Sequence, residues 1–440
     1  MNLPRIRAFP RSSLFEALLL APVLAGAAHA VWHLFAHGYL PQPFIWDPQD
    51  TLMDWFNPAY WAHREGIYSV WHAVYPPLSF ALLKFLTVPE CYISSPFAGR
   101  DCDITAQFIV LALYVMAMGV SYRAIRLVQP RAALLRSLAL ALGLPGLFLL
   151  ERGNLLILCQ LCLAAAVVPG IANKWLRALA AAVMINLKPY MLFPVLSWAI
   201  RREWRLLELA GFATIAVYLA SWAIVGSGSP LEILDNTANW VAVTGADVVG
   251  EMFYTTSFNS MFGVVDRGFP ILRSIGSRDY ETYRTAIQMF LYAAQATAVA
   301  ALLLAWLRPS TVPQARIALL LLLLTLTGRS PGGYAEILVV FLVFLETWSG
   351  FAAIVAIATA YLISIPYEWM ISILPVIHTS SWLSGFAVTA QFGIGVGQFA
   401  RPIGLLLILL VLGLDTIAKV TRALRLDRSQ VQPQPNALVQ

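Results

Sequence analysis

Long apolar stretches recur along the chain, separated by short polar or basic turns. An α-helix needs about 20 apolar residues to cross about 30 Å of hydrocarbon. The stretches also lack the alternation that membrane β-strands require. The pattern therefore predicts an all-α polytopic membrane protein with about 10 to 13 transmembrane or re-entrant helices. We expect spans near residues 14–38, 104–125, 133–150, 155–172, 206–225, 286–307, 314–327, 335–348, 351–366 and 402–418, and a further apolar segment at 383–399 that is a candidate re-entrant element.

Two apolar segments do not fit a simple span. After the Pro76-Pro77 pair only about twelve apolar residues follow, which is too few to cross, so we interpret 77–88 as half-embedded. The stretch from 174 to 205 has basic residues at both ends, yet one span cannot begin and end on the same side. A proline inside a helix removes a hydrogen bond and breaks it. The Lys188-Pro189 step therefore predicts a hairpin of two short helices with Lys188 at its tip.

Basic residues indicate the orientation. Three arginines precede the first span, and the positive-inside rule places such residues in the cytoplasm. The two long polar regions, about 39–103 and 226–284, then lie on the opposite side, with both termini cytoplasmic. We expect one transmembrane domain over 1–420. The remaining segment, 421–440, is basic and then rich in Pro and Gln, which is typical of a disordered tail.

Composition narrows the class of protein. Mean hydropathy is +0.72, and 59% of the residues are hydrophobic against 12% charged, which excludes an ordinary soluble domain. The net charge of +6 comes from basic residues in short turns between apolar segments, so it does not indicate nucleic-acid binding. Only four of the 29 basic residues are lysines, and a chain rich in Arg, Ala and Leu is typical of a high-GC bacterium. We expect a bacterial inner-membrane protein whose long polar regions face the periplasm.

The four cysteines form two pairs. Cys91 and Cys102 lie in the first periplasmic region, where oxidation is possible. Two interpretations stand for them, a disulfide or two free thiols. Cys159 and Cys162 form a C-x-x-C within an apolar run, whereas a redox or metal motif needs an accessible polar site. We expect buried thiols there.

Carboxylates are concentrated just after the first span, at Asp47, Asp50 and Asp54. Asp50 and Asp54 lie four residues apart and share one face if the segment is helical. A carboxylate at the membrane surface can act as a general base toward a hydroxyl. The alternative is a solvated acidic loop. No further ligand at firm spacing supports a metal site here, and we predict none.

Several cations lie at predicted outer or midplane positions. Ionisable groups at membrane depth are costly and mark candidate functional sites, for which an anionic lipid head or phosphate is the natural ligand. The alternative is that they extend to the interface. Lys188 is the strongest candidate because it lies at the predicted helix break. The full set is Arg152, Lys188, Arg267, Arg273, Arg278, Arg284 and Arg329.

Three histidines recur at helical spacing on the first span, His29, His33 and His37. This i, i+4, i+8 spacing can bind a metal. Because Trp32 and Tyr39 flank them near an interface, we favour aromatic-belt packing.

The order of these features resembles the GT-C class of membrane glycosyltransferases, and most closely glycosyltransferase family 87, the polyprenyl-phosphate-mannose-dependent mannosyltransferases. The similarity spans roughly residues 50–270. In the last third the chain has RSPGGYAEI, with Tyr334, but lacks the paired histidines often found in the family. The matching motifs are DWFNPAYWAHREGIY from Asp54, VYPPLSFALLKFL through Tyr75, RGNLLILCQLCLAAAV through Asn154, the Lys188-Pro189 segment, and SFNSMFGVVDR through Asn259 and Arg267.

The resemblance implies a GT-C-like helical bundle and an inverting transfer of mannose or another hexose or pentose. The donor would be a polyprenyl-phosphate-linked sugar and the acceptor a lipid or glycan at the periplasmic face, with no cofactor. Asp54 would be the general base and Asp50 would support it. The donor phosphate or lipid would be bound by Lys188, Arg152, Arg267 and Arg329, and the substrates by Tyr75, Asn154, Asn259 and Tyr334.

Two rival functions remain. A transporter or flippase of lipid-linked sugars commonly shows internal repeats with matching broken helices, whereas this chain has one K-P break without a counterpart. An envelope glycan polymerase or ligase would carry a large external loop with paired arginines late in the chain. Here Arg329 stands alone.

Overall fold

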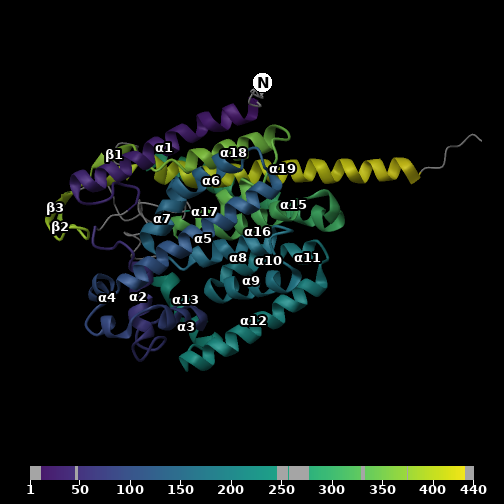
Figure 1. The fold of residues 1–440 in the computed structure, drawn as a ribbon. Coiled ribbons are helices and arrows are strands. Elements are labelled where there is room, and N and C mark those ends of the chain that lie inside the picture. Colours follow the sequence, from purple (N-terminus) through teal and green to yellow (C-terminus); the bar gives the residue numbers. More distant parts are fainter. Residues whose placement is uncertain are drawn as a thin grey trace, which may run out of the picture.

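The computed structural model describes residues 11–44, 48–244, 256, 277–328, 332–373 and 375–431. The chain folds into a largely helical bundle (Figure 1). In the described part, five helices are long and apolar enough to cross a membrane, and a bent helix pair adds a possible sixth. The chain is therefore a largely helical, multi-pass membrane protein. The five helices are α1 (Arg11–His37), α5 (Ile104–Val128), α12 (Trp204–Val225), α15 (Ser277–Leu307) and α19 (Gly397–Val431).

The segment predicted as one span at 133–150 is a bent pair, α6 (Ala133–Leu142) and α7 (Leu144–Arg152), with 44° between its halves. The bend lies at Gly143, two residues before Pro145. A Cβ at Gly143 would lie 2.2 Å from the Ala139 carbonyl oxygen, so only glycine fits there. The bend directs α7, and Arg152 at its end, toward the first polar region.

The predicted break at Lys188-Pro189 is present. Helix α9 (Lys174–Leu187) ends at Lys188, whose backbone is extended, and the short 3-10 helix Pro189–Met191 follows. This is the expected effect of a proline on the residue before it. Two further short helices, α10 (Leu192–Val195) and α11 (Ser197–Ile200), complete the segment. Helix α8 (Leu156–Val167) precedes it, with Cys159 buried and Cys162 half-buried, both as free thiols.

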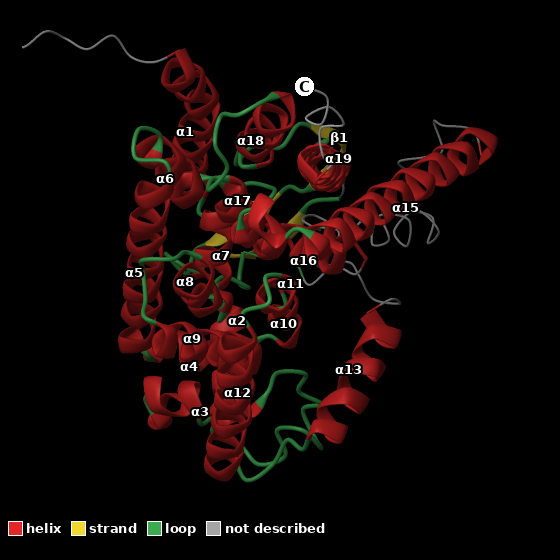
Figure 2. Ribbon diagram, turned by 90° about the vertical axis from the view of Figure 1, so that its right-hand side faces the viewer, coloured by secondary structure: helices red, strands yellow, loops and turns green. Residues whose placement is uncertain are grey.

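The first polar region folds into small helices that lie together at one end of the molecule (Figures 1 and 2). The segment predicted as half-embedded at 77–88 contains helix α3, and its depth in a membrane stays a prediction. Of the two interpretations for Cys91 and Cys102, the disulfide is the one present. The helices are α2 (Met53–Ala62), α3 (Pro77–Leu86), the 3-10 helix Pro89–Tyr92 and α4 (Pro96–Cys102). Helix α13 (Pro230–Thr244) lies in the second polar region.

The prediction of an apolar, candidate re-entrant segment at 383–399 was wrong. Residues 370–395 form short antiparallel strand pairs beside the end of α1, within a chain that is otherwise mostly helical (Figure 1). Short runs of β-branched residues and glycine explain this, because they favour strands and turns over a helix. Strand β1 (Met370–Ile373) pairs with β4 (Gly393–Gly395), and β2 (Ile377–Ser380) pairs with β3 (Ala387–Ala390).

The C-terminal third otherwise consists of shorter apolar helices and the long α19. The predicted end of the transmembrane domain at residue 420 falls inside α19. The expected disorder was therefore wrong for 421–431, which are helical. Residues 432–440 lie outside the described residues. The helical pattern simply continues through this charged stretch. The shorter helices are α16 (Gln314–Gly328), the 3-10 helix Gly333–Ala335, α17 (Glu336–Val343) and α18 (Phe351–Ile363).

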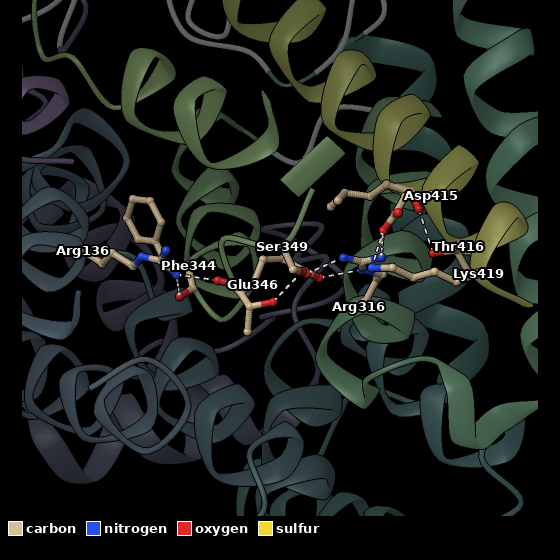
Figure 3. Close-up of polar contacts among 10 residues, drawn as sticks. Arg136, Arg316, Phe344, Glu346, Ser349, Asp415, Thr416 and Lys419 are labelled. Atoms are coloured by element: carbon tan, nitrogen blue, oxygen red, sulfur yellow. Dashed lines mark hydrogen bonds and ion pairs between the residues drawn. The ribbon is translucent and has the colours of Figure 1, made fainter. Parts of the chain in front are cut away.

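A buried network of charges joins five parts of the bundle. Arg136 is completely buried and pairs with Glu16 of α1 at 2.8 Å. It also donates to the Phe344 and Glu346 carbonyl oxygens (Figure 3). The Glu346 carboxylate accepts from Arg316, which also pairs with Asp415 of α19. Buried pairs cost desolvation energy but fix one packing arrangement, so this network sets the register of α1, α6, α16 and α19.

Candidate functional site

Arg152 binds both carboxylates of the predicted acid pair. Its Nη1 lies 2.5 Å from Asp50 Oδ2, and its Nη2 lies 2.6 Å from Asp54 Oδ1. Arg152 ends α7, while Asp54 lies in the first turn of α2. Gly153 follows in the left-handed conformation, and a Cβ there would lie 3.2 Å from Trp55 Cβ. Glycine at this position therefore lets the end of α7 approach α2 closely enough for the ion pairs.

Asn154 holds the other oxygen of Asp54. Its Nδ2 donates to Asp54 Oδ2 at 2.7 Å, and its Oδ1 accepts from the Leu156 N–H at 3.0 Å, in the first turn of α8. The amide is 1% exposed. Because one end of the amide is bound to α8, the other end is aimed at Asp54. The sequence placed Asn154 in a substrate-binding role, whereas here it orients the carboxylate.

The environment of Asp54 favours its charged form. Burial acts to raise the pKa of this carboxyl, but the Arg152 charge, the hydrogen bonds from Arg152 and Asn154, and the Lys188 charge outweigh it. The pKa therefore lies below its ordinary value. The side chain retains 19% exposure, so one edge is open to an incoming group.

The predicted shared helix face for Asp50 and Asp54 was wrong. Helix α2 begins at Met53, and Leu52 before it is in the left-handed conformation, with φ 65°. Asp50 thus lies in a turn outside the helix. The two carboxylates are nevertheless brought together, because both bind Arg152. Asp47 lies outside the described residues.

Lys188 is a buried cation beside aromatic rings. It is 6% exposed, and its Nζ lies 4.1 Å from the centre of the Tyr75 ring and 5.8 Å from that of Tyr334. Within the described ranges no carboxylate lies at ion-pair distance from it, although its charge acts on Asp54. Contact with aromatic faces offsets part of the cost of burying an ammonium but does not neutralise it. This position suits an anionic ligand.

Tyr75 and Tyr334, 259 positions apart in sequence numbering, meet over this one ammonium group. Tyr334 also stacks on Phe148 of α7, at 6.2 Å between ring centres. The structure therefore brings together most of the expected site residues. The full set is Asp50, Asp54, Tyr75, Arg152, Asn154, Lys188 and Tyr334. Asn259, Arg267 and Arg329 lie outside the described residues and stay predictions.

An apolar groove begins at the same helix break. Its volume is about 450 Å³, and it lies between α9, α12 and α13. Pro189, directly after Lys188, and Pro76, directly after Tyr75, both line it. The remaining lining is almost entirely apolar and is formed by Ile185, Asn186, Thr214, Ile215, Tyr218, Leu219, Pro230, Ile233 and Leu234. A ligand with a charged head and an apolar chain fits this combination.

Two residues near the acid pair were missed by the sequence. Glu151 is 6% exposed and lies within electrostatic range of Asp50, Asp54 and Arg152. Arg100 is 1% exposed and donates to the carbonyl oxygens that flank Asp50. Glu151 could have been noticed as the neighbour of Arg152. No pattern in the residues around Arg100 predicts its role, because its hydrogen-bond partners lie about fifty positions earlier in the chain.

The histidines of α1 pack with aromatic rings. The His33 and His37 rings lie 4.4 Å apart, and His29 contacts Trp32 and Tyr367. These contacts agree with the aromatic-belt interpretation. Within the part of the chain that the structure describes, no group of three or more His, Cys, Asp or Glu side chains is placed to hold a metal ion.

Comparison with known proteins adds no relative. A scan against family models and searches of curated proteins and of solved structures found no match to this chain. The function therefore has to be argued from the geometry.

Proposed function

We propose that this protein is an inverting membrane glycosyltransferase that moves a sugar from a polyprenyl-phosphate donor to a hydroxyl of a lipid or glycan acceptor. One observation carries the proposal. A carboxylate held by Arg152 and Asn154 shares a site with the buried ammonium of Lys188, and the next residue, Pro189, lines an apolar groove. The site thus combines a base, an anion-binding group and a place for an apolar chain.

The donor class follows from Lys188 and the groove. A buried ammonium is costly unless an anion lies against it. The groove contributes apolar surface directly beyond Pro189. An amphiphile whose phosphate contacts Lys188 and whose chain fills the groove satisfies both groups at once. A nucleotide sugar would leave the apolar surface unused.

The chemical step needs one proton transfer and one substitution. The acceptor oxygen attacks the anomeric carbon as the bond from that carbon to the phosphate oxygen breaks. The bonding electron pair leaves with the lipid phosphate, and the hydroxyl proton passes to Asp54. The ammonium of Lys188 stabilises the charge that develops on the leaving phosphate, which is worth more in a buried site than in water. Attack opposite the leaving group inverts the anomeric configuration.

A low pKa at Asp54 is compatible with this role. Arg152 and Asn154 keep the carboxylate ionised and aimed, so no proton has to be removed from it before reaction. The acceptor hydroxyl becomes strongly acidic as its oxygen bonds to carbon. A weak base that is correctly placed therefore suffices late in the reaction.

The proposal places the site on the periplasmic side of a bacterial inner membrane. The support is the charge pattern, in which arginines lie at the start of α1 and at the end of α5, while Asp50, Asp54 and Tyr75 of the site lie in the polar region between these helices.

The test combines cells and purified protein. Mass spectrometry of envelope lipids and glycans, with and without the gene, should reveal one missing hexose or pentose. The purified protein in lipid nanodiscs should then transfer label from a polyprenyl-phosphate sugar to membranes of the deletion strain. Asp54→Asn should lower transfer by about 10²-fold or more, while the exposed Asp235→Asn control keeps it.

Two results would contradict the proposal. One is transfer by a folded Asp54→Asn protein at the wild-type rate. The other is movement of intact donor across proteoliposomes without cleavage of the sugar–phosphate bond, which would instead indicate a flippase.

A further inference from the structure

The segment that leads into α2 has a conformation that must be held from outside. Residues 48–52 form turns, and Leu52 adopts a left-handed backbone with φ 65°. A residue with a bulky side chain rarely adopts this conformation, because its Cβ is crowded against the backbone there. No side chain caps the start of α2. The positions of Asp50 and Asp54 therefore depend on contacts that other elements make with this segment.

On one side the contacts come from α7. The Leu52 N–H donates to the Glu151 carbonyl oxygen at 2.7 Å, and Arg152 Nη1 donates to the Asp50 carbonyl oxygen at 3.1 Å. These contacts belong to the acid–arginine site already described. By themselves they fix Asp50 and Leu52 but leave the carbonyl groups of Gln49 and Thr51 to another partner.

On the other side that partner is Arg100 of α4. Its Nη1 donates to the Gln49 carbonyl oxygen at 2.5 Å and to the Thr51 carbonyl oxygen at 3.2 Å. The guanidinium lies over the Phe97 and Trp382 rings, and the residue is 1% exposed. Both bonds come from Nη1, while Nε donates to Asp101 Oδ1 at 2.9 Å, so the planar guanidinium is held at two of its nitrogens. An ammonium is a single point charge and cannot be held in this way.

Helix α4 is itself firmly attached. The Cys91–Cys102 disulfide closes the loop that contains it, and the Ser95 side chain accepts from the Ala98 N–H at its start. Gly99 packs on Tyr92, where a Cβ would lie only 2.7 Å from the ring. Arg100 therefore projects from a fixed support toward the 49–51 backbone.

We propose that Arg100 is a positioning residue for the acid pair: it holds the backbone on both sides of Asp50, and through the start of α2 it sets Asp54 against Arg152. Its link to activity rests on the proposed function, but its link to the 48–54 backbone does not. The two parts can thus be tested separately.

The experiment measures amide hydrogen exchange and sugar transfer on the full-length protein in lipid nanodiscs. In Arg100→Ala, exchange over 48–54 should rise by about tenfold or more, the ratio expected when a charge-assisted hydrogen bond is lost. Arg100→Lys should lie between Ala and wild type. Arg64→Ala is the matched control, because Arg64 donates to the carbonyl oxygens of Tyr92 and Ile93 and lies over Tyr60, but does not contact 49–51.

Transfer should follow the same order, with a lower kcat, an unchanged KM for the donor, and the acid limb of the pH profile moved upward. Unchanged exchange over 48–54 in either Arg100 variant would overturn the inference, whatever the activity. Because Arg100→Lys keeps the charge and most of the stem, it decides the matter even if the Ala variant does not fold. A wild-type protein without transferase activity would refute the proposed function, while the exchange data would still decide the role of Arg100.

Discussion

The Asn154 amide lies 2.7 Å from Asp54 Oδ2 while its own oxygen is bound by the start of α8. The carboxylate that we propose as the base is thus oriented by a buried side chain that cannot turn away without leaving the Leu156 N–H unsatisfied. Together with Arg152, this contact gives each Asp54 oxygen one hydrogen-bond donor and holds the pKa of Asp54 below its ordinary value. Five predictions test this site and the contacts that stabilise the fold around it.

Asn154→Ala should move the acid limb of the transfer pH profile upward. The hydrogen bond from Asn154 lowers the pKa of Asp54, whereas burial raises it. Without this hydrogen bond the pKa should rise, so the carboxylate would protonate at higher pH than in the wild type. The measurement is kcat against pH on the acid side. Asn173→Ala is the matched control, because the Asn173 Oδ1 also accepts from a backbone N–H at the start of a helix, α9, but Asn173 does not contact Asp54. An unchanged acid limb in Asn154→Ala would refute this role.

The same depressed pKa links stability to pH. A carboxyl whose pKa is lower in the folded state contributes stability that is present above its unfolded value, here 3.8, and is lost as pH falls through the folded value. Asp54→Asn should therefore reduce the loss of stability in the window below pH 3.8. Thermal unfolding of both proteins across that window measures the difference. Identical pH dependence of Tm would contradict the ion pair.

Lys188→Ala should weaken binding of polyprenyl phosphate by about 10- to 100-fold, the range for loss of a charge-assisted contact. Binding of the lipid phosphate to protein in nanodiscs measures this without any sugar transfer. Lys188→Arg should keep part of the affinity. Lys84→Ala is the control, because Lys84 is an exposed lysine on the neighbouring helix α3. Equal affinities for all four proteins would leave Lys188 with no part in donor binding.

Reduction of the Cys91–Cys102 disulfide should destabilise the protein by about 2–3 kcal/mol, as expected for a loop of this length. Unfolding should be followed with and without reductant. In a Cys91→Ser/Cys102→Ser protein the reductant should have no effect. If reductant lowers the stability of that variant as well, the effect comes from elsewhere.

Glu16→Gln should destabilise the bundle by about 3–5 kcal/mol, because it leaves the buried Arg136 guanidinium without its counter-charge. A double variant, Glu16→Gln/Arg136→Met, should recover part of this loss. Chemical denaturation in detergent measures all three proteins. Additive losses in the double variant would show that the two side chains do not interact.

Local patterns in the sequence determined much of the architecture. Apolar length predicted the long helices, because a span needs a minimum number of apolar residues wherever it lies. The effect of Pro189 on Lys188 is likewise a property of adjacent residues, and that break is present. The predictions of secondary structure were wrong in two segments, where the composition of the segment and its local backbone preference point to different structures. The apolar run at 383–399 became strands, and the charged stretch 421–431 stayed helical.

Only the tertiary structure decided how the site is assembled. The sequence placed Asp50 and Asp54 on one helix face, whereas they meet through Arg152, 102 and 98 positions away. That pairing depends on the bend at Gly143 and on the close approach of α7 to α2. The contacts of Arg100 and the burial of Arg136 could not be predicted from the sequence either, because their partners also lie far away along the chain. A side chain's partner is set by which backbones pack together, and that is a property of the whole fold rather than of neighbouring residues.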